Sequence, residues 1–148
     1  MKYKSYYLLC LALVILDQLT KQIIVSLFNL GESMVINSYL SWTYIQNTGA
    51  AFSILSGGGA IQKAFLLAVS LFVSAMVMVW IHKTPAIHRQ RLFGQFILLS
   101  GALGNLLDRA QYGYVVDFID VHYQNYYWPV FNVADLSLIH ISEPTRPY

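Results

Sequence analysis

Three long apolar runs with few internal charges constrain this chain more than any other feature. They cover about residues 6–28, 61–81 and 92–108. Because a helix needs about 20 mostly apolar residues to cross the hydrocarbon of a bilayer, each run is predicted to be a membrane-spanning helix. The chain is only 11% charged, whereas a soluble domain averages about 25%. The sequence therefore predicts one all-α integral membrane domain over residues 1–135.

The positions of Lys and Arg indicate how these helices are oriented. Lys and Arg residues cluster before the first run and between the second and third runs. By the positive-inside rule both regions are cytoplasmic, so segments 29–60 and 109–132 lie on the outer face. Most acidic residues fall on that outer side, although they took no part in the argument: Glu32, Asp108, Asp117, Asp120 and Asp135.

The two outer segments have the composition of a small β-rich platform. Leu40, Trp42 and Tyr44 alternate with polar neighbours, which predicts a half-buried strand. Residues 112–131 are rich in Tyr and Trp, whose amphipathic rings settle at the level of the lipid headgroups. Plain interfacial anchoring is an equally good interpretation of any single ring. The three glycines at 57–59 are expected to link the platform flexibly to the second helix.

Two charges lie inside the first apolar run. Asp17 and Lys21 are four residues apart, so on a helix they share one face and can form an ion pair. Ionisable groups within a membrane are costly and are functional hypotheses by default. A structural pair that fixes the first helix to its neighbours is favoured over direct catalysis. A polar relay in a small transporter or assembly protein is the alternative.

The third run ends in the sequence SGALGNLLDR. Gly101 and Gly104 permit close approach of another helix, as small residues do in membranes. Asn105 and Asp108 are three residues apart and share a face near the outer interface, and Arg109 follows them. By itself this motif indicates a structural polar cluster.

Two aspartates carry the chemistry that the sequence best supports. Asp117 lies among apolar residues in YVVDFID and Asp135 in FNVAD, and both segments are predicted on the outer side. Two carboxylates held close together cannot both ionise, so they share a proton. One then acts as general base on a water molecule and the other as general acid on a carbonyl. Asn132 can hydrogen-bond a carboxylate or a peptide carbonyl. This is aspartic-protease chemistry, and we expect neither a cofactor nor a metal.

Other chemistries have little support in the sequence. It contains no HExxH motif or paired-cysteine spacing for zinc, no G-x-S-x-G nucleophile motif and no phosphate-binding glycine loop. The net charge of +2 is too small to indicate a nucleic-acid partner. Cys10 is the single cysteine, so it cannot form an internal disulfide and is expected to pack as a small apolar side chain.

Five motifs together resemble the lipoprotein signal peptidase (signal peptidase II) family. They are LDQLTK at 16–21, NTGAAFS at 47–53, GALGNLLDR at 101–109, VVDFID at 115–120 and FNVAD at 131–135. They occur in this order with suitable spacing, and they extend over nearly the whole chain apart from its tail.

The resemblance implies a four-helix enzyme of the bacterial inner membrane with both termini in the cytoplasm. It implies an endopeptidase that removes the signal peptide from a prolipoprotein, cutting before a cysteine that already carries a diacylglyceryl group. Asp117 and Asp135 match the family's catalytic pair. The residues expected to support the pair or bind substrate are Asp17, Asn47, Asn105, Arg109 and Asn132. Those expected to be structural near the site are Lys21, Gly104 and Asp108.

The resemblance also implies inhibition by the cyclic peptide globomycin and contact with membrane lipids, and we expect a monomer to suffice. A membrane aspartic peptidase for unlipidated peptides would keep the aspartate pair and lose the lipid requirement. The chain departs from the family at its tail, residues 136–148, which is too short and polar to form a fourth spanning helix. On this interpretation the tail is foreign sequence, the fourth helix is truncated, and Asp135 stands at the start of a missing helix.

Overall fold

The computed structural model describes residues 3–49 and 59–139 of the chain. Its three long helices overlap the three apolar runs, and its strands lie in the two segments predicted to be outer, 29–60 and 109–132. Residues 57 and 58 of the expected glycine link lie outside the described residues, as does the tail from residue 140 onward. The elements in chain order are α1 (Lys4–Leu27), β1 (Ser33–Asn37), β2 (Leu40–Asn47), α2 (Ala60–Lys83), α3 (Arg89–Tyr112), β3 (Val115–Tyr123), β4 (Tyr126–Tyr127) and α4 (Val133–Ile139).

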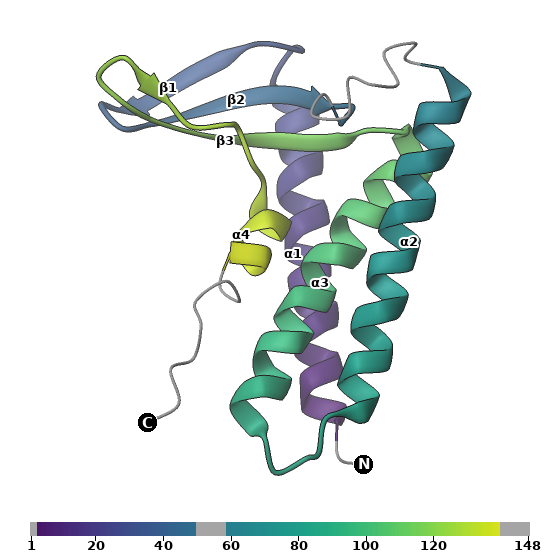
Figure 1. Ribbon diagram of the computed structural model, residues 1–148. Helices are drawn as coiled ribbons and strands as arrows, with labels where there is room; N and C mark the ends of the chain where they lie inside the picture. Colours follow the sequence, from purple (N-terminus) through teal and green to yellow (C-terminus); the bar gives the residue numbers. More distant parts are fainter. Residues whose placement is uncertain (1–2, 50–58, 140–148) are drawn as a thin grey trace.

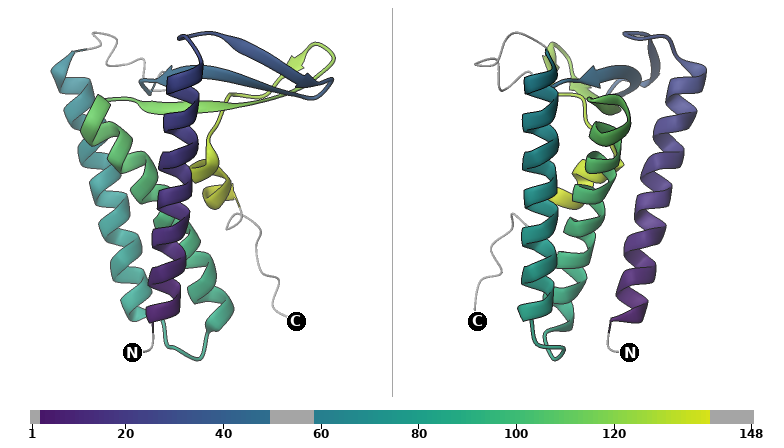
Figure 2. Two further views of the ribbon diagram at one scale, coloured as in Figure 1. Left: turned by 180° about the vertical axis from the view of Figure 1, so that it is seen from behind. Right: turned by 90° about the vertical axis from the view of Figure 1, so that its right-hand side faces the viewer.

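The long helices stand side by side, with α3 between α1 and α2 (Figures 1 and 2). In the described part of the chain, α1 and α2 are long and apolar enough to cross a membrane. The third predicted span differs. α3 also has 24 residues, but it is too polar to be assigned as a spanning helix from its composition. Its enclosure is the physical reason: ten of its residues are buried, against four in each of α1 and α2.

An apolar core holds the helices together at the end away from the sheet. Phe96 of α3 is fully buried there and stacks on Tyr6 of α1, with 5.4 Å between ring centroids. Ile81 of α2 and Leu92 of α3 pack around it. Cys10 joins the same cluster as a free, buried thiol. This core fixes the three helices relative to one another. The polar residues at the other ends of the helices are thereby held in fixed relative positions.

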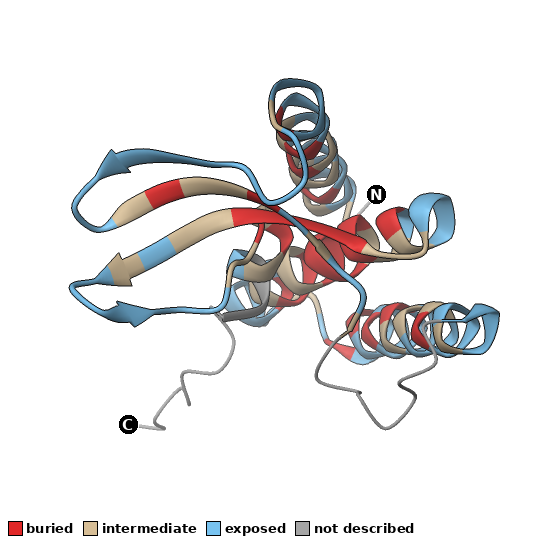
Figure 3. Cartoon of the chain, turned by 90° about the horizontal axis from the view of Figure 1, so that it is seen from above, coloured by how far each residue is buried: buried red, intermediate tan, exposed pale blue. Residues whose placement is uncertain are grey.

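The sheet lies across the other end of the helices and projects beyond them on one side (Figure 1). Its strands are antiparallel in the order β1-β2-β3-β4. β3 is buried where it crosses the helices and more exposed toward its far end (Figure 3). Trp42 lies opposite Ile119 and Ile45 opposite Asp117, so β2 contains one extra residue between these two pairs. Such a bulge re-aims the residues that follow it, and Asn47 at the end of β2 comes to lie beside Asp117.

α4 is short, and it lies beneath the sheet against α3 and α1 (Figure 2). The prediction that no helix begins at Asp135 is wrong, because Asp135 lies in the first turn of α4, a helix of seven residues; that the fourth spanning helix is truncated stays a prediction. A helix start leaves backbone N–H groups without partners inside the helix. Side chains of this chain accept those groups at the start of α4, which explains why the helix forms there.

Candidate active site

Asp117 and Asp135 reach one site from different elements. Asp117 lies in β3 and is only 2% exposed, while Asp135 lies in the first turn of α4. Asn132, which is fully buried, stands between them. Its side-chain Nδ2 donates to Asp117 Oδ1 at 2.7 Å, and its backbone N–H donates to Asp135 Oδ2 at 3.1 Å. The structure thus joins the two carboxylates that the sequence analysis paired. They are called the aspartate pair below.

The start of α4 gives Asp135 a defined position. Asn132 Oδ1 accepts the backbone N–H of Asp135 at 3.0 Å, and Asp135 accepts the backbone N–H of Asn132 in return. This reciprocal arrangement is a capping box, which satisfies two of the N–H groups that a helix start leaves unpaired. A further N–H, that of Ala134, donates to Asp17 Oδ1 at 3.0 Å. α4 is thereby tied to α1 by a residue 117 positions away in the chain.

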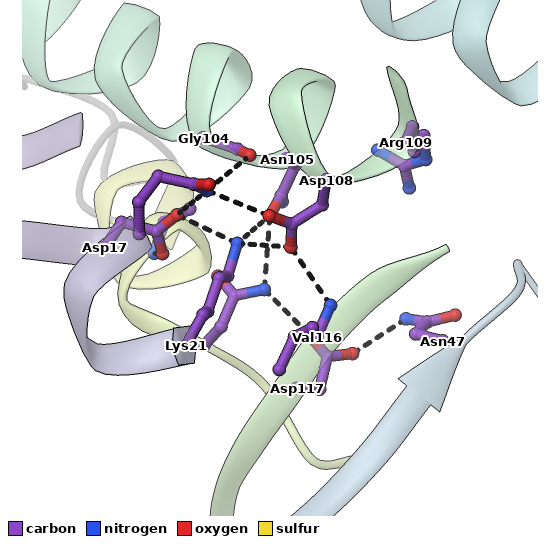
Figure 4. A network of polar contacts seen from close by, with 12 residues as sticks. Asp17, Lys21, Asn47, Gly104, Asn105, Asp108, Arg109, Val116 and Asp117 are labelled. Carbon is purple, nitrogen blue, oxygen red and sulfur yellow. Dashed lines mark hydrogen bonds and ion pairs between the residues drawn. The ribbon is translucent and has the colours of Figure 1, made fainter. Parts of the chain in front are cut away.

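Lys21 is a buried cation beside the aspartate pair. Its Nζ lies 2.8 Å from Asp17 Oδ2 and 2.9 Å from Asp108 Oδ2, so the ion pair predicted from the four-residue spacing is present and extends to α3. A third bond goes to Asn105 Oδ1 at 3.1 Å. Figure 4 shows Lys21 reaching from α1 toward these residues of α3. Asn105 and Asp108 share a face, as predicted, since both contact Lys21.

Asn105 and Asp108 each hold one member of the aspartate pair in place. Asn105 Nδ2 donates to Asp135 Oδ1 at 2.9 Å. Asp108 Oδ2 accepts the backbone N–H of Val116 at 3.0 Å, which fixes the residue before Asp117 and with it the start of β3. Two successive turns of α3 therefore position α4 and β3 relative to each other.

Asp117 is surrounded by groups that act on its charge. Burial disfavours the ionised carboxylate and raises the pKa of Asp117 to about 6. The hydrogen bond from Asn47 Nδ2 to Asp117 Oδ2, at 2.9 Å, lowers this pKa, and so does the bond from Asn132. The nearby charge of Asp135 raises it. A pKa of about 6 lies closer to neutral pH than that of an ordinary aspartate, which suits a group that holds or releases a proton.

Arg109 lies on the side of α3 that faces α2. Its Nη1 donates to Ser70 Oγ at 3.0 Å, and its Nε is buried with no hydrogen-bond partner among the described residues. The guanidinium is close enough to attract the charges of Asp135 and Asp117. A pocket of about 170 Å³ lies beside it, lined by apolar residues of α2 and α3 and by Ser70, Asn105 and Arg109.

The arrangement is suited to proton transfer at a peptide carbonyl. Two carboxylates supply an acid and a base, and amide and guanidinium groups next to them can donate to a carbonyl oxygen. Among residues 3–49 and 59–139, no three His, Cys, Asp or Glu side chains converge as a metal site would require.

Known proteins share both the sequence and the fold of this chain. Residues 9–141 match the family profile described as signal peptidase (SPase) II. The chain belongs to the signal peptidase II family. The lipoprotein signal peptidase of Cellvibrio japonicus is 40% identical over 137 residues, which cover 93% of this chain and 81% of that protein. The lipoprotein signal peptidase of Pseudoalteromonas translucida is 41% identical over 130 residues, covering 88% of this chain and 78% of that protein.

Two solved structures agree with the signal peptidase II assignment. Both are described as a bacterial membrane enzyme determined by the in meso method, at 2.3 and 1.9 Å resolution, and both are 35% identical to this chain. The TM-scores are 0.79 and 0.82, over 93% of this chain and 82% and 86% of the other chains. The mostly helical fold with a small antiparallel sheet is thus shared with membrane enzymes.

The alternative interpretation of Asp17 and Lys21 as a polar relay in a transporter or assembly protein has no support. An ammonium group has three N–H donors, and Lys21 directs them at Asp17, Asp108 and Asn105. Lys21 is thus engaged with α3, and Asp17 with Lys21 and the start of α4.

Some contacts in this signal peptidase II site are not predicted by the sequence analysis. Gln18 Nε2 donates to Asp108 Oδ1 at 2.8 Å, and Ser70 accepts from Arg109. A polar residue inside an apolar helix was the available signal for Ser70. For the cap at the start of α4, the signal was the spacing of Asn132 and Asp135 before an apolar stretch.

Proposed function

We propose that this chain is a membrane aspartic endopeptidase that removes the signal peptide from diacylglyceryl-modified prolipoproteins, cutting before the lipidated cysteine. Membership of the signal peptidase II family and the names of the relatives support the reaction and the prolipoprotein substrate. We assign Asp117 and Asp135 as the catalytic pair. The observation that carries this assignment is their connection through the buried Asn132, which contacts both carboxylates.

The proposed reaction uses the pair as acid and base. With one proton on Asp117, the carboxylate of Asp135 takes a proton from a water molecule, and the water oxygen bonds to the scissile carbonyl carbon. Asp117 gives its proton to the carbonyl oxygen, which produces a tetrahedral diol. Collapse of the diol moves a proton to the leaving nitrogen, breaks the C–N bond and leaves one proton shared by the pair.

The pKa of Asp117 supports this placement of the shared proton. Burial raises it to about 6, whereas an exposed aspartate has a pKa of about 3.9 and would be ionised at any physiological pH. A bound substrate would exclude further water from the site and raise the pKa again.

Asn47, Asn105 and Asn132 are proposed to hold the carboxylates in their reactive orientation, because each donates a hydrogen bond to one of them. Arg109 is proposed to bind substrate. Its Nε has no partner among the described residues and it lines the pocket between α2 and α3, where a peptide carbonyl could accept from it.

We propose that the site faces the outer side of a bacterial inner membrane. Lys4, Lys83 and Arg89 lie at the helix ends away from the sheet (Figure 1). The positive-inside rule assigns those ends to the cytoplasm and the opposite ends, with the site, to the outer face. The sheet would then lie on the membrane surface, where exposed rings such as Tyr126 and Trp128 fit the headgroup layer.

A lipid-modified substrate suits a site at this depth. Its acyl chains would remain in the bilayer against the apolar outer surfaces of the helices while the scissile bond enters the polar site. The pocket beside Arg109 has an apolar wall and a polar end, as such a substrate requires. We expect globomycin to compete for this site and a monomer to be sufficient.

Cleavage assays on purified protein in detergent test the proposal. The substrates are a diacylglyceryl-modified prolipoprotein and its unlipidated form. The variants are Asp117→Asn and Asp135→Asn, with Asp120→Asn as the matched control. Asp120 lies on the same strand as Asp117, but its carboxylate accepts from Thr43, outside the buried site.

We expect the unaltered chain and the Asp120→Asn variant to cut the lipidated substrate only, and both variants of the pair to lose at least about a thousand-fold in kcat. Cleavage of both substrates would contradict the proposed specificity for lipidated substrate and would indicate a membrane peptidase for peptides in general. Activity retained in either variant of the pair would overturn the residue assignment.

A further inference from the structure

Lys21 donates a hydrogen bond to Asn105 in addition to its two ion pairs. It is 2% exposed, and its Nζ contacts the carboxylates of Asp17 and Asp108. The third contact goes to a neutral group, Asn105 Oδ1, at 3.1 Å. This bond points toward the aspartate pair, because the same asparagine donates to Asp135.

The bond from Lys21 decides which way the Asn105 amide faces. An ammonium group only donates, so it can be satisfied only by the oxygen side of the amide. With Oδ1 on Lys21, Nδ2 is presented to Asp135 Oδ1 at 2.9 Å. A flipped amide would place its oxygen against that carboxylate, where two acceptors repel.

A second donor to Asn105 Oδ1 is weaker. Asn132 Nδ2 lies 3.2 Å from Asn105 Oδ1 but 2.7 Å from Asp117 Oδ1, so its shorter bond goes to the aspartate. Lys21 is therefore the charged donor that holds the amide, while Asn132 links the same amide to the other member of the pair. One cation on α1 thus connects to both carboxylates through two asparagines.

We propose that Lys21 is a positioning residue of the peptidase reaction, which orients Asn105 and through it the carboxylate of Asp135. This inference rests on the function proposed above, and it assigns Lys21 a role beyond the structural ion pair expected from the sequence. A carboxylate displaced by about 1 Å from its reactive geometry costs on the order of 100-fold in rate, so the orientation of one amide can control kcat.

Lys21 also acts on the charge of the pair. Its positive charge lowers the pKa of Asp117. Asp135 on α4 and Arg109 on α3 also act on the charge of Asp117, while Asp17 on α1 and Asp108 on α3 pair with Lys21. Removal of the Lys21 charge therefore raises the pKa of Asp117 and moves the loss of its proton to higher pH.

The experiment compares Lys21→Met with Asp108→Asn in the full chain, purified in detergent. Lys21→Met removes the charge and the bond to Asn105 and keeps the length of the side chain. Asp108→Asn breaks an ion pair of Lys21 and leaves its bond to Asn105 available. The measurements are kcat, KM, the pH dependence of kcat/KM on the lipidated prolipoprotein, and the thermal unfolding midpoint.

We expect Lys21→Met to lower kcat about 10- to 100-fold with KM changed less than about threefold, and to shift the upper pH limit of kcat/KM to higher pH. Asp108→Asn should lose thermal stability while keeping the pH limit. Lys21→Arg, which retains the charge and donors, should restore the pH limit.

Two buried carboxylates lose their partner in Lys21→Met, so the variant can fail to fold. The double variant Lys21→Met with Asp108→Asn removes one of these carboxylates, and it is compared with Asp108→Asn alone. Equal kcat and an equal pH limit in that comparison would overturn the inference and return Lys21 to a structural role. If the unaltered chain cuts nothing, the proposed function itself is wrong and the inference falls with it.

Discussion

The carboxylate of Asp17 occupies the space where a side chain on Gly104 would begin. A β-carbon added to Gly104 would lie 2.5 Å from Asp17 Oδ2 and 3.1 Å from its Cγ. Real β-carbons do not approach atoms so closely, so any side chain at this position displaces Asp17. Since Asp17 also accepts the backbone N–H of Ala134, the displacement would reach the first turn of α4.

We therefore expect Gly104→Ala to destabilise the protein by about 1–3 kcal/mol, the usual cost of overpacking a buried contact, and to lower kcat at least about tenfold. Thermal unfolding and cleavage of the lipidated substrate measure the two effects. Gly31→Ala is the control: it has open space around it, and its positive φ of 82° adds backbone strain of about 1–2 kcal/mol far from the site. Full activity in Gly104→Ala would show that Asp17 does not position α4.

Substitution of Asn132 separates the helix cap from the donor to Asp117. Asn132→Asp keeps an acceptor for the N–H of Asp135 but replaces the amide donor with a third carboxylate. We expect α4 to remain folded and kcat to fall at least about 100-fold, because Asp117 loses the amide donor that orients its carboxylate and is repelled by the new one. Hydrogen exchange over α4 and the cleavage assay report on the two roles separately.

Asn132→Ala removes the cap as well as the donor. A lost cap costs about 1–2 kcal/mol, so the amides of α4 should exchange faster in this variant than in Asn132→Asp. Equal exchange in the two variants would mean that the capping box contributes little to α4.

The raised pKa of Asp117 predicts how stability varies with pH. Because the pKa rises from 3.8 unfolded to about 6 folded, the stability linked to this proton is fully present below about pH 3.8 and is lost as pH rises through about 6. A shift of about two units corresponds to about 3 kcal/mol. Asp117→Asn carries no such charge but weakens the bond with Asn47.

Asp117→Asn should therefore be more stable than the unaltered chain at pH 8. The weakened hydrogen bond costs about 1 kcal/mol, so the net gain in the free energy of unfolding is about 1–2 kcal/mol. Near pH 4 this advantage should disappear. Thermal unfolding midpoints in detergent at both pH values test the prediction, with Asp120→Asn as control. A difference between the two proteins that does not change with pH would contradict it.

Arg109 offers a test of substrate binding. Arg109→Lys keeps the charge but loses the Nε donor and the planar fork that also reaches Ser70. We expect KM for the lipidated substrate to rise about tenfold, a loss of about 1.4 kcal/mol, with kcat changed much less. Arg89→Lys, an exposed position at the opposite end of α3, should leave both constants unchanged. A fall in kcat with constant KM would instead place Arg109 in the chemical step.

The helices could be predicted because a bilayer imposes a length and an apolar composition on any spanning segment, whatever its neighbours. α3 is less apolar than that composition requires, because other elements enclose it. It can therefore carry Gln95, Asn105 and Asp108 in buried positions. The positive-inside rule placed both aspartates on the same side of the membrane. The rule could not predict that Asn132 joins them, because that contact depends on how the start of α4 packs near β3.

Local signals were also left unused. The spacing of Asn132 and Asp135 is that of a capping box, which indicates a helix start without any tertiary information. It indicated the start of α4, although not how far that helix extends. The contact of Gln18 with Asp108 had no such signal, because the two are 90 positions apart and only the packing of α1 on α3 brings them together.

The capping box also bears on how the enzyme comes into being during synthesis. On the proposed assignment Asp135 serves both the backbone of α4 and the reaction, so a nascent chain that ends before the first turn of α4 holds Asp117 without its partner. Proteolytic capacity therefore does not accumulate helix by helix as the protein enters the bilayer. On this assignment it depends on α4 reaching its place against α3 and α1.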